Sequence, residues 1–142
     1  MAYATQAQLI DRFGEDFLIR LTDRAEPATG AIDANVVARA IADTDAMIDG
    51  YIAGRYALPL AENPPLVIDL AQVIAIYKLH VYEPDQKIRA DYEDAMRQLR
   101  EIAGGTIKLP VAGLDPEGAG GTGVRVTDRE RPMTEDNLKG FI

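Results

Sequence analysis

The stretch PPLVIDLAQVIAIYKL, residues 64–79, constrains the fold more than any other part of this sequence. Its two prolines follow Asn63, and proline is tolerated in the first turn of a helix, where its missing N–H has no partner to lose. The residues that follow are apolar on most sides of a helix, so other elements must surround this segment. The sequence therefore predicts a buried central helix, and this helix is too short and too often interrupted by polar residues to cross a bilayer.

Two short helical segments are expected near the N-terminus. Thr5 and Gln8 have the spacing of a capping box, in which each side chain satisfies a free amide at the start of a helix. Gly14 is expected to end this first helix. Residues 15–21 predict another short helical turn, and the proline and glycine in residues 25–33 indicate a loop.

A longer helix is expected after that loop. Asp33 is a suitable N-cap, because its carboxylate can accept hydrogen bonds from the first free amides. Arg55 lies where a cation favours a helix C-terminus, so we expect it to stabilise the end of this same helix. Apolar or small residues recur at helical spacing: Val37, Ala40, Ile41, Thr44, Ile48, Tyr51 and Ile52.

A last helix is expected over residues 85–102. Asp85 follows Glu83 and Pro84 and is positioned as its N-cap, and Gly104 with Gly105 ends it. One apolar stripe runs along it, with charged residues elsewhere: Ile88, Tyr92, Ala95, Met96, Leu99 and Ile102.

These segments predict an all-α fold, a compact bundle of four to five helices. A chain of 142 residues is long enough for one domain with its own core. Trp is absent and aromatic residues are only 6%, so that core must be mainly aliphatic. We expect a helical body over residues 1–105 that folds without the rest of the chain.

The remaining residues, 106–142, are expected to form an extended C-terminal arm. Glycine and proline dominate it, and no helical stripe continues. Residues 106–110 and 123–127 alternate apolar and polar side chains, which is typical of short strands. The arm has either of two interpretations, a solvated tail or an assembly element that pairs with another chain. On the second interpretation the contact residues are Val124, Arg125, Val126, Arg129, Arg131, Phe141 and Ile142.

No catalytic or metal site is expected. His80 lies on an apolar helix without a recognisable partner, which favours a structural role. Asp45 and Asp49 lie one helical turn apart; a solvated acidic face is a better explanation than a shared cation, because no further ligands are near. The glycine-rich EGAGGTG lacks the lysine of a phosphate-binding loop, and Glu117 would repel a phosphate. We therefore expect neither an enzyme nor a cofactor.

Charge and cysteine content bound the environment. The formal net charge of −8 argues against a protein that binds nucleic acid through its phosphates. Cysteine is absent, which excludes disulfides and thiolate metal sites. The first residues lack the pattern of a signal peptide. These features predict a soluble protein made in the cytoplasm, with no membrane partner.

Three stretches together carry a family resemblance: YATQAQLIDRFGEDFLIRLTDR, IDGYIAGRYALPL and PPLVIDLAQVIAIYKL. In this order they resemble the small virion proteins of Mu-like prophages. The resemblance covers residues 3–102, whereas the segment after Gly113 shows no motif of that family. The family has no catalytic residues to transfer.

The resemblance implies a head–tail connector, a helical adaptor at the head–tail junction of the virion. Such adaptors form a homo-oligomeric ring of about a dozen copies beneath the portal protein of a tailed phage. A tail-terminator or head-closure protein is then expected on the other side, with DNA passing through the channel without sequence-specific binding. The alternative is a small phage-encoded regulatory protein whose arm folds on a host target.

Overall fold

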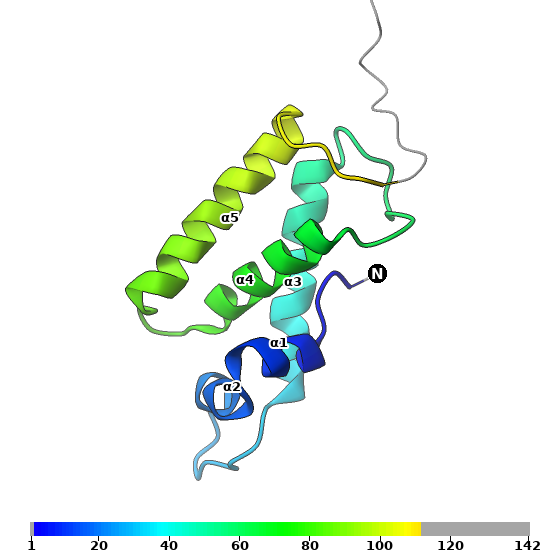
Figure 1. Ribbon diagram of the computed structural model, residues 1–142. Helices are drawn as coiled ribbons and strands as arrows, with labels where there is room; N and C mark the ends of the chain where they lie inside the picture. The colour runs from blue at the N-terminus through cyan, green and yellow to red at the C-terminus, as the bar shows by residue number, and fades with distance from the viewer. Residues whose placement is uncertain (1, 112–142) are drawn as a thin grey trace, which may run out of the picture.

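Five α-helices make up the described part of the chain, residues 2–111 of the computed structural model, and Figure 1 shows their arrangement. No strand occurs in that part. The all-α prediction is confirmed, whereas the short strand expected at residues 106–110 is wrong. The helices are α1 (Gln6–Phe13), α2 (Glu15–Thr22), α3 (Ala34–Ile52), α4 (Pro65–Leu79) and α5 (Gln86–Gly104).

The first two helices begin and end as their sequence predicts. The Gln8 amide donates to Thr5 Oγ1 at 3.3 Å, and the Thr5 amide donates to Gln8 Oε1 at 3.0 Å, which completes the capping box. Gly14 has a φ of 91°, a value that L side chains rarely adopt, and it separates α1 from α2. The chain therefore turns sharply between two short helices.

Helix α3 is the long helix expected after the loop. Asp33 Oδ1 accepts hydrogen bonds from the Asn35 amide at 3.0 Å and the Val36 amide at 3.4 Å, so its capping role is confirmed. Most of the predicted stripe is buried, and only Ile41 and Tyr51 stay half-exposed. The buried members are Val37, Ala40, Thr44, Ile48 and Ile52.

Helix α4 is the central helix that its sequence predicts. It packs against α1, α3 and α5, and Figure 1 shows it between α3 and α5. Burial of apolar side chains on nearly every side supplies most of the stabilising free energy of such a fold. Its buried residues are Val67, Leu70, Ala71, Val73, Ile74, Ala75, Ile76 and Leu79.

Helix α5 closes the bundle on the other side of α4. The ring of its Tyr92 stacks on that of Tyr77, with centroids 3.8 Å apart and planes inclined by 7°. Asp85 occupies the N-cap position as predicted, but its side chain makes no capping hydrogen bond. Gly105 follows α5 in the left-handed conformation, with a φ of 84°. The buried stripe consists of Ala95, Met96, Leu99 and Ile102.

The core extends beyond the helices at both ends. Tyr3 and Ala4 precede α1 and lie in the same apolar cluster as Leu109 and Val111, which follow α5. The expected helical body of residues 1–105 therefore lacks two side chains that pack in this core. None of the helices in residues 2–111 is long and apolar enough to cross a membrane.

Candidate assembly surfaces

The first part of the arm is attached to the end of the bundle. The Leu109 amide donates a buried hydrogen bond to the hydroxyl of Tyr56 at 2.9 Å. Leu109 and Val111 are 7% and 9% exposed, so both side chains pack in the core. The point at which the chain leaves the described body is therefore held by packing and by a hydrogen bond.

Arg55 supports the same end of the molecule. Its Nε donates to the Ala103 carbonyl at 2.8 Å, and its Nη2 donates to the Gly104 carbonyl at 2.9 Å. Arg55 lies just beyond the end of its own helix, as expected, but its side chain makes these hydrogen bonds to another helix. The guanidinium instead satisfies free carbonyls at the C-terminus of α5, which ends beside it.

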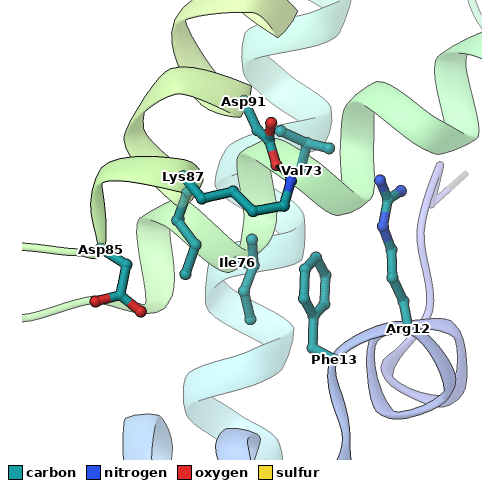
Figure 2. Close-up of a pocket in the computed structure, with 8 residues that line it drawn as sticks. Arg12, Phe13, Val73, Ile76, Asp85, Lys87 and Asp91 are labelled. Atoms are coloured by element: carbon teal, nitrogen blue, oxygen red, sulfur yellow. Dashed lines mark hydrogen bonds and ion pairs between the residues drawn. The ribbon is translucent and has the colours of Figure 1, made fainter.

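An open groove lies between α1, α4 and α5. Phe13 of α1, Val73 and Ile76 of α4, and Ile88 of α5 form its apolar walls around about 380 Å³ of space. Figure 2 shows Ile76 and Phe13 below the long side chain of Lys87. A volume of this size is within the range of sites that bind small molecules or peptide side chains.

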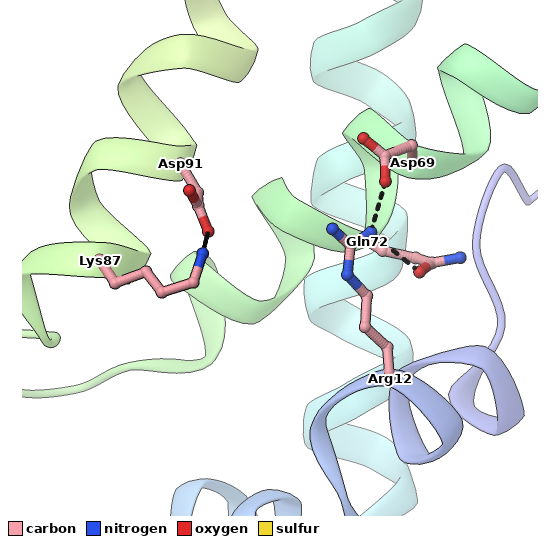
Figure 3. Close-up of polar contacts among 5 residues, drawn as sticks. All are labelled: Arg12, Asp69, Gln72, Lys87 and Asp91. Carbon is pink, nitrogen blue, oxygen red and sulfur yellow. Dashed lines mark hydrogen bonds and ion pairs between the residues drawn. The ribbon is translucent and has the colours of Figure 1, made fainter.

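Charged residues surround this groove. Arg12 pairs with Asp69 at 2.6 Å and also donates to Gln72 at 3.2 Å, while Lys87 pairs with Asp91 at 2.7 Å (Figure 3). Asp85 also lines the groove, and it makes no ion pair within residues 2–111. The rim therefore has both signs of charge, and one of its carboxylates has no cationic partner in the described chain.

A second surface lies at the loop between α4 and α5. Val81 and Tyr82 are 61% and 88% exposed, and they line a shallow pocket together with Arg20 and Arg24. Exposed aromatic residues beside arginine are common where proteins bind one another. The sequence offered only a weak signal for this surface, two large apolar residues outside any helical stripe.

His80 borders this second surface and has structural contacts. Its Nδ1 lies 2.8 Å from the Ile76 carbonyl oxygen, which can only accept, so the ring proton is on Nδ1. Its ring also lies 5.8 Å from that of Phe17. Within residues 2–111 no group of three or more histidine or acidic side chains is placed to hold a metal ion.

Asp45 and Asp49 bind the start of the chain. The Tyr3 amide donates to Asp45 Oδ1 at 3.0 Å, and the Tyr3 hydroxyl donates to Asp49. Burial raises the pKa of the Tyr3 phenol, and burial also raises the pKa of Asp45. The expected solvated acidic face is therefore wrong, because the two carboxylates hold the N-terminal segment against α3.

The arm residues expected to contact a partner lie outside the described part of the chain. The same is true of Glu117 and the glycine-rich stretch, and of the strand expected at residues 123–127. The residues concerned are Val124, Arg125, Val126, Arg129, Arg131, Phe141 and Ile142. The groove and the attachment by Tyr56 could not be predicted from the sequence, because both depend on residues far apart in the chain.

Comparison with known proteins extends the resemblance beyond the helices. The Bacteriophage Mu, Gp36 family matches residues 3–127, which includes part of the arm that showed no family motif. Gene product J of Escherichia phage Mu is 33% identical over 142 residues, covering all of both chains. The Mu-like prophage FluMu protein gp36 of Haemophilus influenzae is 30% identical over 140 residues, covering 99% of this chain and 98% of its own. The chain belongs to the Bacteriophage Mu Gp36 family of phage proteins.

Proposed function

We propose that this protein is a head–tail connector subunit of a Mu-like phage or phage-like particle. Its copies assemble into a homo-oligomeric ring beneath the portal protein. The observation that carries this proposal is the attachment of the first arm residues by Tyr56, in a chain that matches a phage Mu protein along its whole length. A connector needs both a rigid body and a segment that reaches another subunit.

The helical body suits the rigid part of this function. Its core is closed around α4, and the hydrogen bonds of Tyr3 and Tyr56 attach the residues before α1 and after α5. Forces on the arm would therefore reach the core through backbone and buried side chains. A subunit built in this way can transmit load between neighbours without unfolding locally.

The charge of the chain suits a channel for DNA. A formal net charge of −8 per subunit, multiplied around a ring, repels phosphates and lets a duplex slide. The ring, of about twelve copies, would contact the portal protein on one face and a tail-terminator or head-closure protein on the other. The protein would then reside at the head–tail junction of the virion.

Deletion of residues 112–142 tests this function. The variant ends after Val111, so it keeps every buried side chain of the described core. We expect particles with DNA-filled heads that lack joined tails, seen by electron microscopy, while the truncated protein still folds. A control arm of equal length but glycine–serine sequence separates the effect of arm sequence from that of arm length.

Two results would overturn the proposal. Infectious particles of normal yield from the deletion would show that the arm is dispensable for joining. Absence of the protein from purified particles, together with stoichiometric recovery on a host protein, would identify a regulatory binding protein instead. Co-purification with portal or tail proteins is the result that the connector function requires.

A further inference from the structure

We propose that the groove between α1, α4 and α5 binds residues 138–142 of the arm of a second copy. This inference rests on the proposed function, because it names the surface that receives the arm. The sequence of that segment is LKGFI, with three large apolar side chains and one lysine. The groove offers apolar walls and an acidic rim residue, so the chemistry of the two is complementary.

The apolar part of the match involves specific positions. Val73 and Ile76 are three residues apart on α4, and they line the groove together with Phe13 of α1 and Ile88 of α5. Both α1 and α5 pack against α4, and the half-buried side chains of Phe13 and Ile88 leave the space between them open. A space of about 380 Å³ accommodates side chains such as those of Phe141 and Ile142.

The charges favour this segment over others in the arm. Asp85 lines the groove without a capping hydrogen bond and without an ion pair in the described chain. Lys139 lies within the apolar segment and can pair with it. The other apolar stretch of the arm also contains a cation, Arg125, between Val124 and Val126. Its valine side chains are smaller than those of LKGFI and would fill less of the groove.

The arm is long enough to reach the groove of a second copy. The groove lies at the start of α5, beside Ile88. The arm follows the other end of α5, after Gly104 (Figure 1). Sixteen residues of α-helix place these two points about 24 Å apart. The 26 residues between Val111 and Leu138 span up to about 90 Å when extended. This length lets the segment extend beyond its own body to the groove of a neighbouring copy.

A contact of this kind also has the symmetry that a ring needs. The donor uses one end of its body and the acceptor uses the other, so the interface is heterologous and each subunit can both give and receive a segment. Repetition of the same contact then closes a ring if the rotation between neighbours allows it. Each subunit would thereby be linked to the next through residues 138–142 of its arm as well as through contacts of its helical body.

Disulfide cross-linking between two differently substituted full-length proteins tests the contact. The natural chain has no cysteine, so each introduced thiol is unique. Protein carrying Ile88→Cys is mixed with protein carrying Phe141→Cys, oxidised, and separated on a denaturing gel. We expect a covalent heterodimer, and at most a tenth as much when Arg100→Cys, exposed near the other end of α5, replaces Ile88→Cys.

A charge reversal gives a second measurement that does not alter the apolar walls. Asp85→Lys should lower the heterodimer yield about fivefold, the equivalent of about 1 kcal/mol. Adding Lys139→Asp on the donor chain, the chain that provides the arm segment, should restore the heterodimer yield. Asp94→Lys, at an exposed position on α5 away from the groove, serves as the matched control and should leave the yield unchanged.

Three outcomes would overturn this inference. The first is cross-linking only within one chain that carries both Ile88→Cys and Phe141→Cys, which would indicate closure onto the same body. The second is equal cross-linking to Arg100→Cys. The third is no cross-link to either position. If the third result occurs while deletion of residues 112–142 still blocks tail joining, the connector function stands and the arm binds another partner.

Discussion

The guanidinium of Arg55, just beyond the end of α3, donates from Nη2 to the carbonyl oxygen of Gly104, the last residue of α5, at 2.9 Å. The same side chain leaves no room for a Cβ atom on Gly105. Two helices that are far apart in sequence therefore end together, at the point where the arm begins. Substitutions at Arg55 and Gly105 can therefore measure how much this contact contributes to the free energy of unfolding.

Gly105→Ala should destabilise the protein in two ways that can be separated. The φ of 84° strains any L side chain by about 1–2 kcal/mol, and the new Cβ displaces the Arg55 guanidinium from its two carbonyls. In an Arg55→Ala background only the backbone strain remains, so the free-energy loss should be smaller by about 1 kcal/mol or more. Chemical denaturation of the natural protein, the two single variants and the double variant measures the difference.

Gly104→Ala is the matched control for this cycle. Gly104 is helical, and a Cβ atom there meets nothing within 4 Å. This substitution should be neutral or stabilise the protein by up to about 1 kcal/mol. Equal losses for Gly105→Ala in the two backgrounds would contradict the coupling to Arg55.

Tyr3→Phe should lower the free energy of unfolding by about 1–2 kcal/mol. The substitution removes the hydroxyl that donates to Asp49 and leaves a half-buried carboxylate without that bond. Tyr82→Phe makes the same chemical change at a side chain that is 88% exposed, so its stability should be unchanged. Urea denaturation of both variants checks this, and equal stability of Tyr3→Phe and the natural protein would argue against the bond.

Truncation after Val111 should leave a helical protein that melts cooperatively, whereas truncation after Gly105 should lower its stability by at least about 3 kcal/mol. The shorter variant loses the buried side chains of Leu109 and Val111 and the hydrogen bond to Tyr56. Thermal unfolding followed by far-UV circular dichroism compares them. Equal melting temperatures for the two truncations would show that the start of the arm adds nothing to the core.

Acid should weaken the loop between α2 and α3 through Asp23. Its carboxylate accepts hydrogen bonds from the Gly30 amide at 2.8 Å and the Thr29 amide at 3.2 Å, and these bonds lower its pKa from 3.8. A lowered pKa in the folded state contributes stability that is present above pH 3.8 and is lost as the pH falls below it.

Asp23→Asn separates this contribution from other acid effects. The variant should be less stable than the natural protein at neutral pH, and the gap should narrow as the pH falls below 3.8. Asp43→Asn, at an exposed position of α3, controls for the loss of one carboxylate. A gap that stays constant with pH would contradict the role of Asp23. Melting curves recorded across the acid range provide the measurement.

Local patterns in the sequence determined the helices. Helix boundaries depend on short-range chemistry, such as the Thr5 capping box, the Asp33 cap and the glycines that end α1 and α5. The burial of α4 followed from its own apolar residues, which no surface helix would tolerate. The all-α class and the central position of this helix were therefore predictable.

Contacts between distant residues were decided only by the tertiary structure. Arg55 was expected to act on its own helix, but packing brings the free carbonyls of α5 to it. Asp45 and Asp49 were expected to form a solvated face, but in the structure both accept hydrogen bonds from Tyr3. The groove at Ile88 likewise exists only because α1 and α5 meet α4 at separate places. The periodicity of apolar residues in the sequence indicates which face of a helix is apolar. Which residues pack against that face depends on how all five helices pack together.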